Sequence, residues 1–338
     1  MKKKKLLTLI LTVIMVTSIA GCSTKSDSST NIKDTTKSEV STTNWPKKPI
    51  QMVVPYNPGG DSDFNARAYA KRLEKVLGQP VVVTNVAGSG GAIGSRQAKD
   101  SDPDGYTVLF YHVSMFVNQV VDATDYGLEA FETASISGRN GGSVITVNAK
   151  SPYKTLDDLV KASKANPGKL TFAANVGAST SVMGQSLNDA GGEFNLVDIG
   201  DATERVAALM GNQIDAIPNA LGTTIPYIQS GDFRALAIIE DERNPLYPDV
   251  PTAAELGYKG VSLPIYYFTA FPKGTPADII DKFNSACEEV SKMDDYKKEI
   301  ADAFMQTPYF VKGKEAKEIL EKQQAEILKL KGKLMNKK

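Results

Sequence analysis

Three short apolar runs, separated by glycine-containing loops, constrain the fold of this chain most. The runs cover residues 50–54, 81–83 and 106–110, and the first two lead into loops at 56–60 and 88–94. Between the first loop and the second run, apolar residues recur at the i, i+3, i+4 and i+7 spacing of a helix. Strand, glycine loop and helix repeated along a chain predict a parallel α/β sheet with helices packed on it.

The same alternation resumes after a glycine-rich break at residues 138–142. Thr155 opens a helix with a capping-box pattern, and this helix is expected to stop before Pro167. A chain of 338 residues organised in this way is expected to form two packed units. Further strands are predicted at residues 144–147, 170–174, 196–199, 214–217 and 234–239.

The last part of the chain is predicted to be helical. Thr275 and Pro276 are typical of a helix N-cap and first helical residue, and the apolar face that follows includes Cys287, which we expect to be buried. A Lys- and Glu-rich helix over residues 314–334 is predicted to dock on the body. A basic membrane-binding helix is the alternative.

The first 22 residues have the organisation of an export signal. Lys2 to Lys5 precede an apolar run over residues 6–19, which is short for a membrane span. The run ends in Ile19-Ala20-Gly21-Cys22, which resembles the lipobox of bacterial lipoproteins. We therefore expect residues 1–21 to be a lipoprotein signal peptide and Cys22 to be lipidated. An ordinary signal peptide or an uncleaved anchor is the alternative.

Residues 22–44 are predicted to be a disordered tether. Ser and Thr dominate this segment, and beyond Cys22 only Ile32 and Val40 are apolar. Such a segment cannot bury enough apolar surface to order itself. We expect it to hold a globular body away from a membrane.

Charge and composition exclude several classes of function. The chain has 39 Lys and Arg against 39 Asp and Glu; removing the four Lys of residues 1–21 leaves 35 against 39, a net charge of −4. A body without a basic field is not expected to bind nucleic acid. With two Cys and one His, we expect no disulfide scaffold, no metal site and no cofactor.

Ordered motifs along the body carry a specific resemblance. In chain order they include Trp45-Pro46-x-x-Pro49-Ile50, Val53-Val54-Pro55-Tyr56-x-Pro58-Gly59-Gly60-x-x-Asp63, Leu77-Gly78-Gln79-Pro80, Pro103-Asp104-Gly105-Tyr106-Thr107, Gly211-Asn212-Gln213-Ile214-Asp215 and Pro248-Asp249-Val250-Pro251-Thr252. Over essentially all of residues 45–338 the chain resembles the Bug/TctC family. These proteins are the extracytoplasmic solute-binding receptors of tripartite tricarboxylate transporters.

The resemblance implies a type II periplasmic-binding-protein fold, in which two α/β lobes surround a ligand cleft and are joined by two hinge crossings. Lobe 1 would comprise residues 45–142 and, with the C-terminal helices, 236–338; lobe 2 would comprise residues 143–235. The break at 138–142 suits the first crossing, and the second is expected between Asp232 and Phe268.

The resemblance also implies how such a protein works and where. A monomer, anchored through lipid on Cys22 at the outer face of the cytoplasmic membrane or in the periplasm, would close on a small carboxylic acid or amino acid. It would then deliver this ligand to integral-membrane permease subunits. A receptor that senses the ligand without a dedicated permease is the alternative.

Candidate ligand contacts follow from the loops at the strand ends, because open α/β sheets bind ligands where loops and helix N-termini present backbone N–H groups. His112 and Ser114 follow the third strand, and Asn219 follows a later one. For His112, the alternative is a rim histidine that makes one local hydrogen bond. By position, the resemblance further implies contacts from Tyr56, Asn57, Gly59, Gly60, Asp61 and Ser62, from Gly88, Ser89 and Gly90, and from Gly177, Ala178, Ser179 and Thr180.

Three acidic residues near the proposed cleft depart from the family pattern. Asp61 replaces a small hydroxyl residue. Where relatives often read Val-Pro-Tyr-Lys-Gly, this chain has Val197-Asp198-Ile199-Gly200-Asp201, which removes a basic residue and adds Asp198 and Asp201. A carboxylate beside an anionic ligand costs affinity. We therefore hypothesise a ligand with a neutral or cationic portion, such as an amino acid, with Asp201 in the site. The alternatives are a plain carboxylate ligand, and Asp61 and Asp201 acting as helix caps.

An enzyme is the competing class of function. Residues 177–181 resemble a nucleophile elbow, but the last position is Ser181 and only one histidine exists to act as base. Residues 88–94 have Ile93 where a dinucleotide-binding loop requires glycine. We expect no catalytic residues, and a hydrolase is the less favoured reading.

Overall fold

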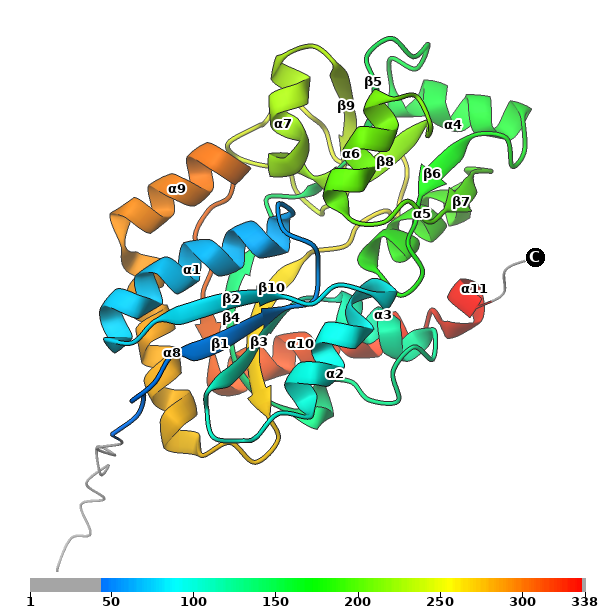
Figure 1. Cartoon of the computed structure of the whole chain (residues 1–338). Helices are drawn as coiled ribbons and strands as arrows, with labels where there is room; N and C mark the ends of the chain where they lie inside the picture. The colour runs from blue at the N-terminus through cyan, green and yellow to red at the C-terminus, as the bar shows by residue number, and fades with distance from the viewer. Residues whose placement is uncertain (1–43, 336–338) are drawn as a thin grey trace, which may run out of the picture. The chain divides into compact units, whose positions relative to one another are not determined.

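The computed structural model describes residues 44–335, which fold around two β-sheets (Figure 1). The predicted signal peptide, Cys22 and all of the tether except Asn44 lie outside the described residues. Within the described part, no helix has the length and apolar character needed to cross a membrane.

The first sheet contains six strands in the order β11-β4-β10-β3-β1-β2. β1 pairs in parallel with β2 and with β3, whereas β10 runs antiparallel between β3 and β4. Met52, Val53 and Val54 are fully buried, as expected for a central strand covered on both faces. The strands are β1 (Ile50–Val54), β2 (Val81–Asn85), β3 (Thr107–Tyr111), β4 (Phe131–Arg139), β10 (Tyr266–Pro272) and β11 (Val311–Lys312).

Helices pack on this sheet and on one another. The buried guanidinium of Arg72 pairs with Asp295 (3.2 Å) and Glu299 (2.7 Å), and the ring of Tyr69 meets that of Tyr296 at 4.9 Å. These contacts join the first helix to a helix more than 200 residues later, so both ends of the chain build one lobe. The helices are α1 (Asp61–Leu77), α2 (Ala92–Lys99), α3 (Ser114–Val120), α8 (Ala277–Lys292), α9 (Asp294–Phe304) and α10 (Gly313–Leu328), with short 3-10 turns at Ser89–Gly91 and Leu128–Ala130.

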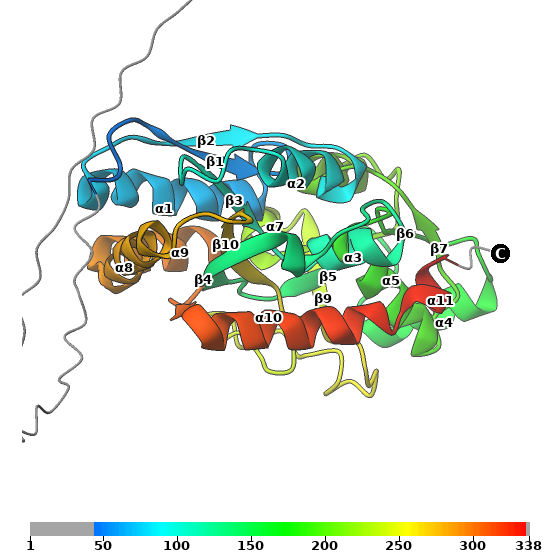
Figure 2. The ribbon, with the colours of Figure 1, turned by 90° about the horizontal axis from the view of Figure 1, so that it is seen from below.

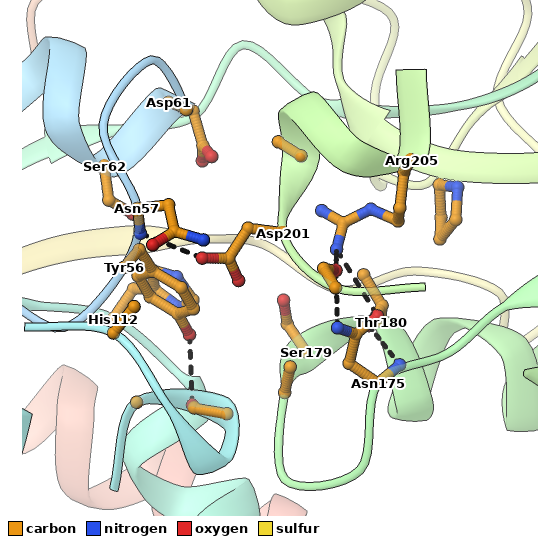
Figure 3. A pocket seen from close by; sticks show the side chains of 18 of the residues that line it. Tyr56, Asn57, Asp61, Ser62, His112, Asn175, Ser179, Thr180, Asp201 and Arg205 are labelled. Carbon is orange, nitrogen blue, oxygen red and sulfur yellow. Dashed lines mark hydrogen bonds between the residues drawn. The ribbon is translucent and has the colours of Figure 1, made fainter. Parts of the chain in front are cut away.

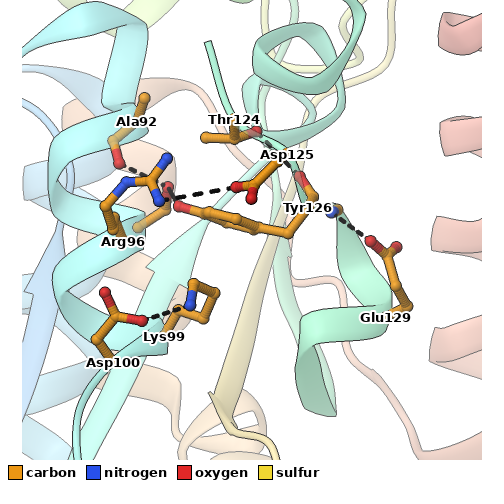
Figure 4. A network of polar contacts seen from close by, with 10 residues as sticks. Ala92, Arg96, Lys99, Asp100, Thr124, Asp125, Tyr126 and Glu129 are labelled. Atoms are coloured by element: carbon orange, nitrogen blue, oxygen red, sulfur yellow. Dashed lines mark hydrogen bonds and ion pairs between the residues drawn. The ribbon is translucent and has the colours of Figure 1, made fainter. Parts of the chain in front are cut away.

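Tyr126 fixes α2 to the segment that follows α3 (Figure 4). Its hydroxyl shares a hydrogen bond with Ser95 Oγ (3.0 Å), and the Arg96 guanidinium lies 5.4 Å from its ring. Thr124 Oγ1 donates to the Tyr126 carbonyl (2.9 Å). This network holds α2 at Ser95 and Arg96, and α2 itself begins directly after the glycine loop that follows β2.

The second sheet contains five strands in the order β7-β6-β8-β5-β9. β6 is parallel to β7 and β8, whereas β5 is antiparallel to β8 and β9. The strands are β5 (Ser143–Asn148), β6 (Thr171–Ala173), β7 (Asn195–Val197), β8 (Ala216–Ala220) and β9 (Phe233–Ile238), and the helices around them are α4 (Leu156–Ala165), α5 (Ser179–Asp189), α6 (Ala202–Met210) and α7 (Leu221–Gln229).

Two segments cross between the sheets. The first, residues 140–142, joins β4 to β5, and the second, residues 239–265, joins β9 to β10. Arg139 and Glu240, at the start of each crossing, form an ion pair of 2.7 Å. Because β9 ends at Ile238, the predicted lobe boundary at residue 235 falls inside a strand of the second sheet.

The C-terminal helices contact both lobes. α10 buries Ala316, Leu320 and Ile327, which confirms that this helix docks on the body. The single helix predicted over residues 314–334 is wrong, because α10 ends at Leu328 and a short α11 (Lys331–Met335) follows (Figure 2). Lys331 pairs with Asp122 after α3, and Lys333 pairs with Asp189 at the end of α5.

Other predicted elements are present with shifted ends. Thr155 caps α4 in a capping box with Asp158, and Cys287 is fully buried, as predicted. Thr275 does not cap a helix: its hydroxyl donates to the carbonyl of Pro272, and Pro276 is the N-cap of α8. The strand predicted at residues 214–217 is β8 at Ala216–Ala220.

Candidate functional site

A cavity of about 540 Å³ lies between the two sheets, at the carboxyl ends of strands from each (Figure 3). The first lobe contributes the loops after β1, β2 and β3, and the second contributes those after β6 and β7. Residues of the crossings, including Asn140 and Ile265, close the back. Three helices, α1, α5 and α6, begin at this cavity and direct their N-termini toward it.

Asp61 enters the cavity from the first turn of α1. Asp63, and not Asp61, makes the hydrogen bonds at the helix N-terminus. Its Oδ2 accepts from the Gly59 N–H (3.0 Å), and its Oδ1 accepts from Arg67 Nε (2.9 Å). Asp61 Oδ2 accepts from the Tyr267 hydroxyl at 2.6 Å. Burial, followed by the charge of Asp61, raises the pKa of Tyr267, so the phenol remains a donor to this carboxylate.

Tyr56 and His112 form an aromatic wall on the same side. Their rings are stacked, with centroids 5.1 Å apart and planes 5° from parallel. His112 Nδ1 accepts from the Ser114 N–H (3.3 Å), so the neutral ring carries its proton on Nε2. Burial lowers the pKa of His112 to about 4, which keeps the ring neutral near pH 7. His112 thus both lines the cavity and makes one local hydrogen bond.

The glycine loop after β2 touches the opposite lobe. The Gly90 carbonyl accepts from the Tyr111 hydroxyl (2.9 Å) and from Asn118 Nδ2 (3.1 Å). A Cβ on Gly90 would lie 2.7 Å from the backbone of Gly177, in the loop before α5. Gly90 also has a φ of +61°, so a side chain is excluded by both conformation and space.

Two hydrogen bonds connect the walls of the cavity. The Ser179 N–H, at the start of α5, donates to Ser114 Oγ (2.8 Å). The Asn57 N–H, after β1, donates to Asp201 Oδ2 (2.8 Å). Asp201 is also the N-cap of α6, where it forms a capping box with Glu204. Burial raises the pKa of Asp201, although the Asn57 bond and Arg205 oppose that rise.

Arg205, in the first turns of α6, is the basic residue of the cavity wall. Its Nε donates to Asn219 Oδ1 (2.7 Å) and its Nη1 to the Gly200 carbonyl (2.6 Å). Asn219 Nδ2 in turn donates to the Ala202 carbonyl (2.9 Å), which fixes the guanidinium. Within residues 44–335, Arg205 forms no ion pair and its Nη2 has no hydrogen-bond partner. Burial lowers the pKa of Arg205, as expected for a desolvated cation.

A family model described as "Tripartite tricarboxylate transporter family receptor", TctC, matches residues 65–335. The chain belongs to the TctC receptor family. It is also similar to Protein BugT of Bordetella pertussis, at 35% identity over 256 residues, which is 74% of this chain and 78% of BugT. The predicted family is therefore confirmed, and with it an extracytoplasmic location.

Solved structures with the same two-lobed fold agree with this assignment. A periplasmic transporter superimposes with a TM-score of 0.80 at 32% identity, covering 85% of this TctC receptor and 97% of that chain. MatC (Rpa3494) from Rhodopseudomonas palustris, solved with bound malate, has a TM-score of 0.77 at 23% identity, covering 86% of this receptor and 100% of MatC, and shows the shared fold. The predicted periplasmic-binding-protein fold is confirmed.

Most residues predicted as contacts of this TctC receptor line the cavity. Four do not. Ser114 and Asn219 form hydrogen bonds with the lining residues Ser179 and Arg205. Gly177 lies beside Asn118, and Gly59 lies beside Thr203. The residues that do are Tyr56, Asn57, Gly60, Asp61, Ser62, Gly88, Ser89, Gly90, His112, Ala178, Ser179, Thr180 and Asp201.

Sequence reasoning missed Arg205 and Asn175, although both line the cavity. The Asn175 N–H donates to Thr180 Oγ1 (2.9 Å), which orders the loop before α5. Arg205 lies four residues after the N-cap Asp201. This spacing places a side chain on the same helix face as the cap and was the available signal.

Proposed function

We propose that this TctC-family chain is a lipid-anchored receptor that captures a small carboxylate-bearing ligand, a carboxylic acid or an amino acid, and delivers it to a membrane permease. The observation that carries the proposal is the buried Arg205, which forms no ion pair with any described residue and lines a cavity between two lobes. A guanidinium with a free N–H is suited to a ligand carboxylate. Three helix N-termini directed at the same cavity add favourable dipoles. The malate of MatC, which shares this fold, is a ligand of this chemical kind.

Capture would occur by closure of the first lobe, residues 45–139 and 266–335, upon the second lobe, residues 143–238. The Asn57–Asp201 and Ser114–Ser179 hydrogen bonds join the two lobes directly, without a ligand between them. A ligand that contacts both walls adds to these bonds and shifts the population toward the closed arrangement. The closed monomer would then dock on the permease.

Lipidation of Cys22 would keep the receptor at the membrane, with residues 22–44 as the tether. This part of the proposal rests on the sequence pattern of residues 1–22. Membrane fractionation of cells that express Cys22→Ser should show the protein released. Retention of that variant in the membrane fraction would contradict lipid anchoring.

Binding without catalysis is the second part of the proposal. His112 is the one histidine of the chain, and its low pKa makes it a weak general base near pH 7. Its Nδ1 already accepts from the Ser114 N–H. Ser179 at the start of α5 therefore has no histidine suited to activate it.

Calorimetric titration of the purified receptor with a panel of mono-, di- and tricarboxylates and amino acids tests the proposed function. We expect saturable binding of at least one compound with one ligand per chain. Arg205→Gln should lower that affinity at least tenfold, while the midpoint of thermal unfolding in the absence of ligand shows whether the fold survives. The proposal fails if no compound in the panel binds.

A further inference from the structure

We infer that the ligand of this cavity is an amino-carboxylate, whose ammonium group is bound by Asp61 and Asp201 and whose carboxylate is bound by Arg205. This inference rests on the proposed function and specifies the chemical class of the ligand. It separates amino acids and related amine-bearing acids from plain di- and tricarboxylates.

The charges in the cavity wall are the first observation. Four carboxylates, those of Asp61, Asp198, Asp201 and Glu204, line the cavity together with a single guanidinium, that of Arg205. His112 adds no charge near pH 7 because burial keeps it neutral. A dianionic ligand would bring further negative charge into a wall that is already acidic. An ammonium group brings the opposite charge.

Within residues 44–335, no cation contacts the carboxylates of Asp61 and Asp201, although both interact with Arg205 through its charge at longer range. Neither forms an ion pair within the described residues. Asp61 accepts from the Tyr267 hydroxyl of its own lobe, whereas Asp201 accepts from the Asn57 N–H across the cavity and from the Glu204 N–H of its own helix. An ionised carboxylate has about four acceptor positions, so both side chains keep unused lone pairs. They come from opposite lobes, and Figure 3 shows both side chains directed into the same space. A cation placed there would join the two lobes.

Arg205 is the second, independent observation. Arg205 is only 9% exposed, and its Nη2, in the cavity wall, has no hydrogen-bond partner in the part of the chain that the structure describes: only Nε and Nη1 donate hydrogen bonds there. Figure 3 shows the guanidinium on the far side of the cavity from Asp61. A desolvated cation requires a counter-anion, and an Arg held by two of its nitrogens is positioned to receive one. The cavity wall therefore has groups of both signs that form no ion pair within the described residues, with Asp61 on the first lobe and with Asp201 and Arg205 on α6 of the second.

A zwitterion satisfies both sets of groups at once. Its carboxylate compensates Arg205, and its ammonium compensates Asp61 and Asp201 without adding net charge. A plain carboxylate would compensate only Arg205 and would leave the two acidic side chains unpaired. The ring of Tyr56, beside Asp201 in Figure 3, offers an aromatic face of the kind to which ammonium groups are attracted.

Calorimetric titration with matched pairs of probes tests this inference. Each pair keeps the carbon skeleton and removes the amine: aspartate and succinate, glutamate and glutarate, alanine and propionate, 4-aminobutyrate and butyrate. We expect at least one amine-bearing probe to bind the wild-type receptor at least tenfold more tightly than its partner. If the desamino partners bind equally well or better, the inference is overturned while the proposed function stands. If no probe of either kind binds, both are overturned.

Variants then locate the ammonium site. Asp61→Asn and Asp201→Asn keep size and can keep the Tyr267 and Asn57 hydrogen bonds, and each should reduce the preference for the amine-bearing probe at least tenfold. Asp100→Asn, at an exposed position that does not line the cavity, is the matched control and should leave the preference unchanged. Thermal unfolding without ligand reports whether each variant folds. A preference that survives in both cavity variants would overturn the assignment of Asp61 and Asp201, even if amine-bearing probes bind.

Discussion

At the scale of single residues, His112 shows how burial sets side-chain chemistry. The residue is 5% exposed, its ring lies on that of Tyr56, and the ring of Tyr267 meets it edge-on at 6.2 Å. Asp61 favours the charged form, but burial has the larger effect and lowers the pKa from 6.5 to about 4. The histidine therefore acts as a neutral, polar part of an aromatic wall.

This low pKa predicts acid sensitivity. Between pH 6.5 and pH 4 the unfolded chain binds a proton at residue 112 that the folded chain does not. The contribution of His112 is therefore fully present above pH 6.5 and is lost as pH falls, by up to about 3 kcal/mol at pH 4. His112→Asn keeps an acceptor for the Ser114 N–H and removes the titration. Urea unfolding across this range should show a shallower pH dependence in the variant; equal slopes would contradict the prediction.

Individual residues also show how much of the site could be predicted from the sequence. The glycine loops and the residues after β1 were predicted because their turn chemistry is local in sequence. Arg205 was not, because its role depends on burial and on Asn219, which comes from a different element. Whether Asp61 and Asp201 cap helices or face the cavity also required the fold: Asp201 does both, and Asp61 bonds to Tyr267, 206 positions away in sequence.

At the scale of elements, the loop after β2 controls how closely the lobes approach. Gly90 on the first lobe lies against the backbone of Val176 and Gly177 on the second, where a Cβ would come within 2.9 Å of three backbone atoms. Main-chain atoms cannot move aside as a flexible side chain can. The backbone of this loop is therefore in close contact with the backbone of the second lobe beside the cavity.

Gly90→Ala should weaken ligand binding by opening this contact. We expect the affinity for the best ligand of the panel to fall at least tenfold. The free energy of unfolding should fall only by the strain of a positive φ, roughly 1 kcal/mol. Gly168→Ala is the matched control, because Gly168 has a similar φ of +68° and no atom within 4 Å of a built Cβ. Calorimetry should show unchanged affinity in the control. Equal loss in both variants would show that strain, and not the interlobe contact, is responsible.

Contacts between elements also explain why the predicted ends of several strands and helices were wrong. Apolar runs predicted where strands lie, but each strand ends where its partners end, as β8 does beside β5 over residues 216–220. The break between α10 and α11 follows from tertiary contacts, since Lys331 and Lys333 pair with different lobes. Such partners lie far away in sequence and leave no local pattern.

At the scale of the whole molecule, an ion pair and backbone contacts join the two crossings: the Asn140 N–H donates to the Ile265 carbonyl (2.9 Å), and Arg139 pairs with Glu240. Glu240 is 3% exposed and its carboxylate meets Arg139 at 2.7 Å, where the chain leaves each sheet. Burial raises the pKa of Glu240, and Arg139 opposes that rise. The pair therefore favours the ionised form of a buried carboxylate beside both hinge segments.

Arg139→Met should destabilise the fold more at pH 8 than at pH 5. Without its cation, Glu240 has a pKa raised further above that of the unfolded chain, so stability present at low pH is lost as pH rises. We expect a loss of about 2 kcal/mol at pH 8, less than for a fully buried pair because the Arg139 side chain is 37% exposed. Glu240→Gln removes the charge itself and should show a smaller loss without this pH dependence. Equal losses for Arg139→Met at both pH values in urea unfolding would refute the prediction.

The point at which the chain enters the body has a consequence for motion. Trp45 is buried, and β1, the central strand of the first sheet's parallel part, starts five residues later and ends at the cavity. The segment before Trp45 is thus covalently continuous with the six-stranded half alone, whereas residues 143–238 are joined to that half through the two crossings. Restraint of the N-terminus would hold the six-stranded half stationary. The five-stranded half, with Arg205 and Asp201, would then be the part that travels when ligand enters or leaves.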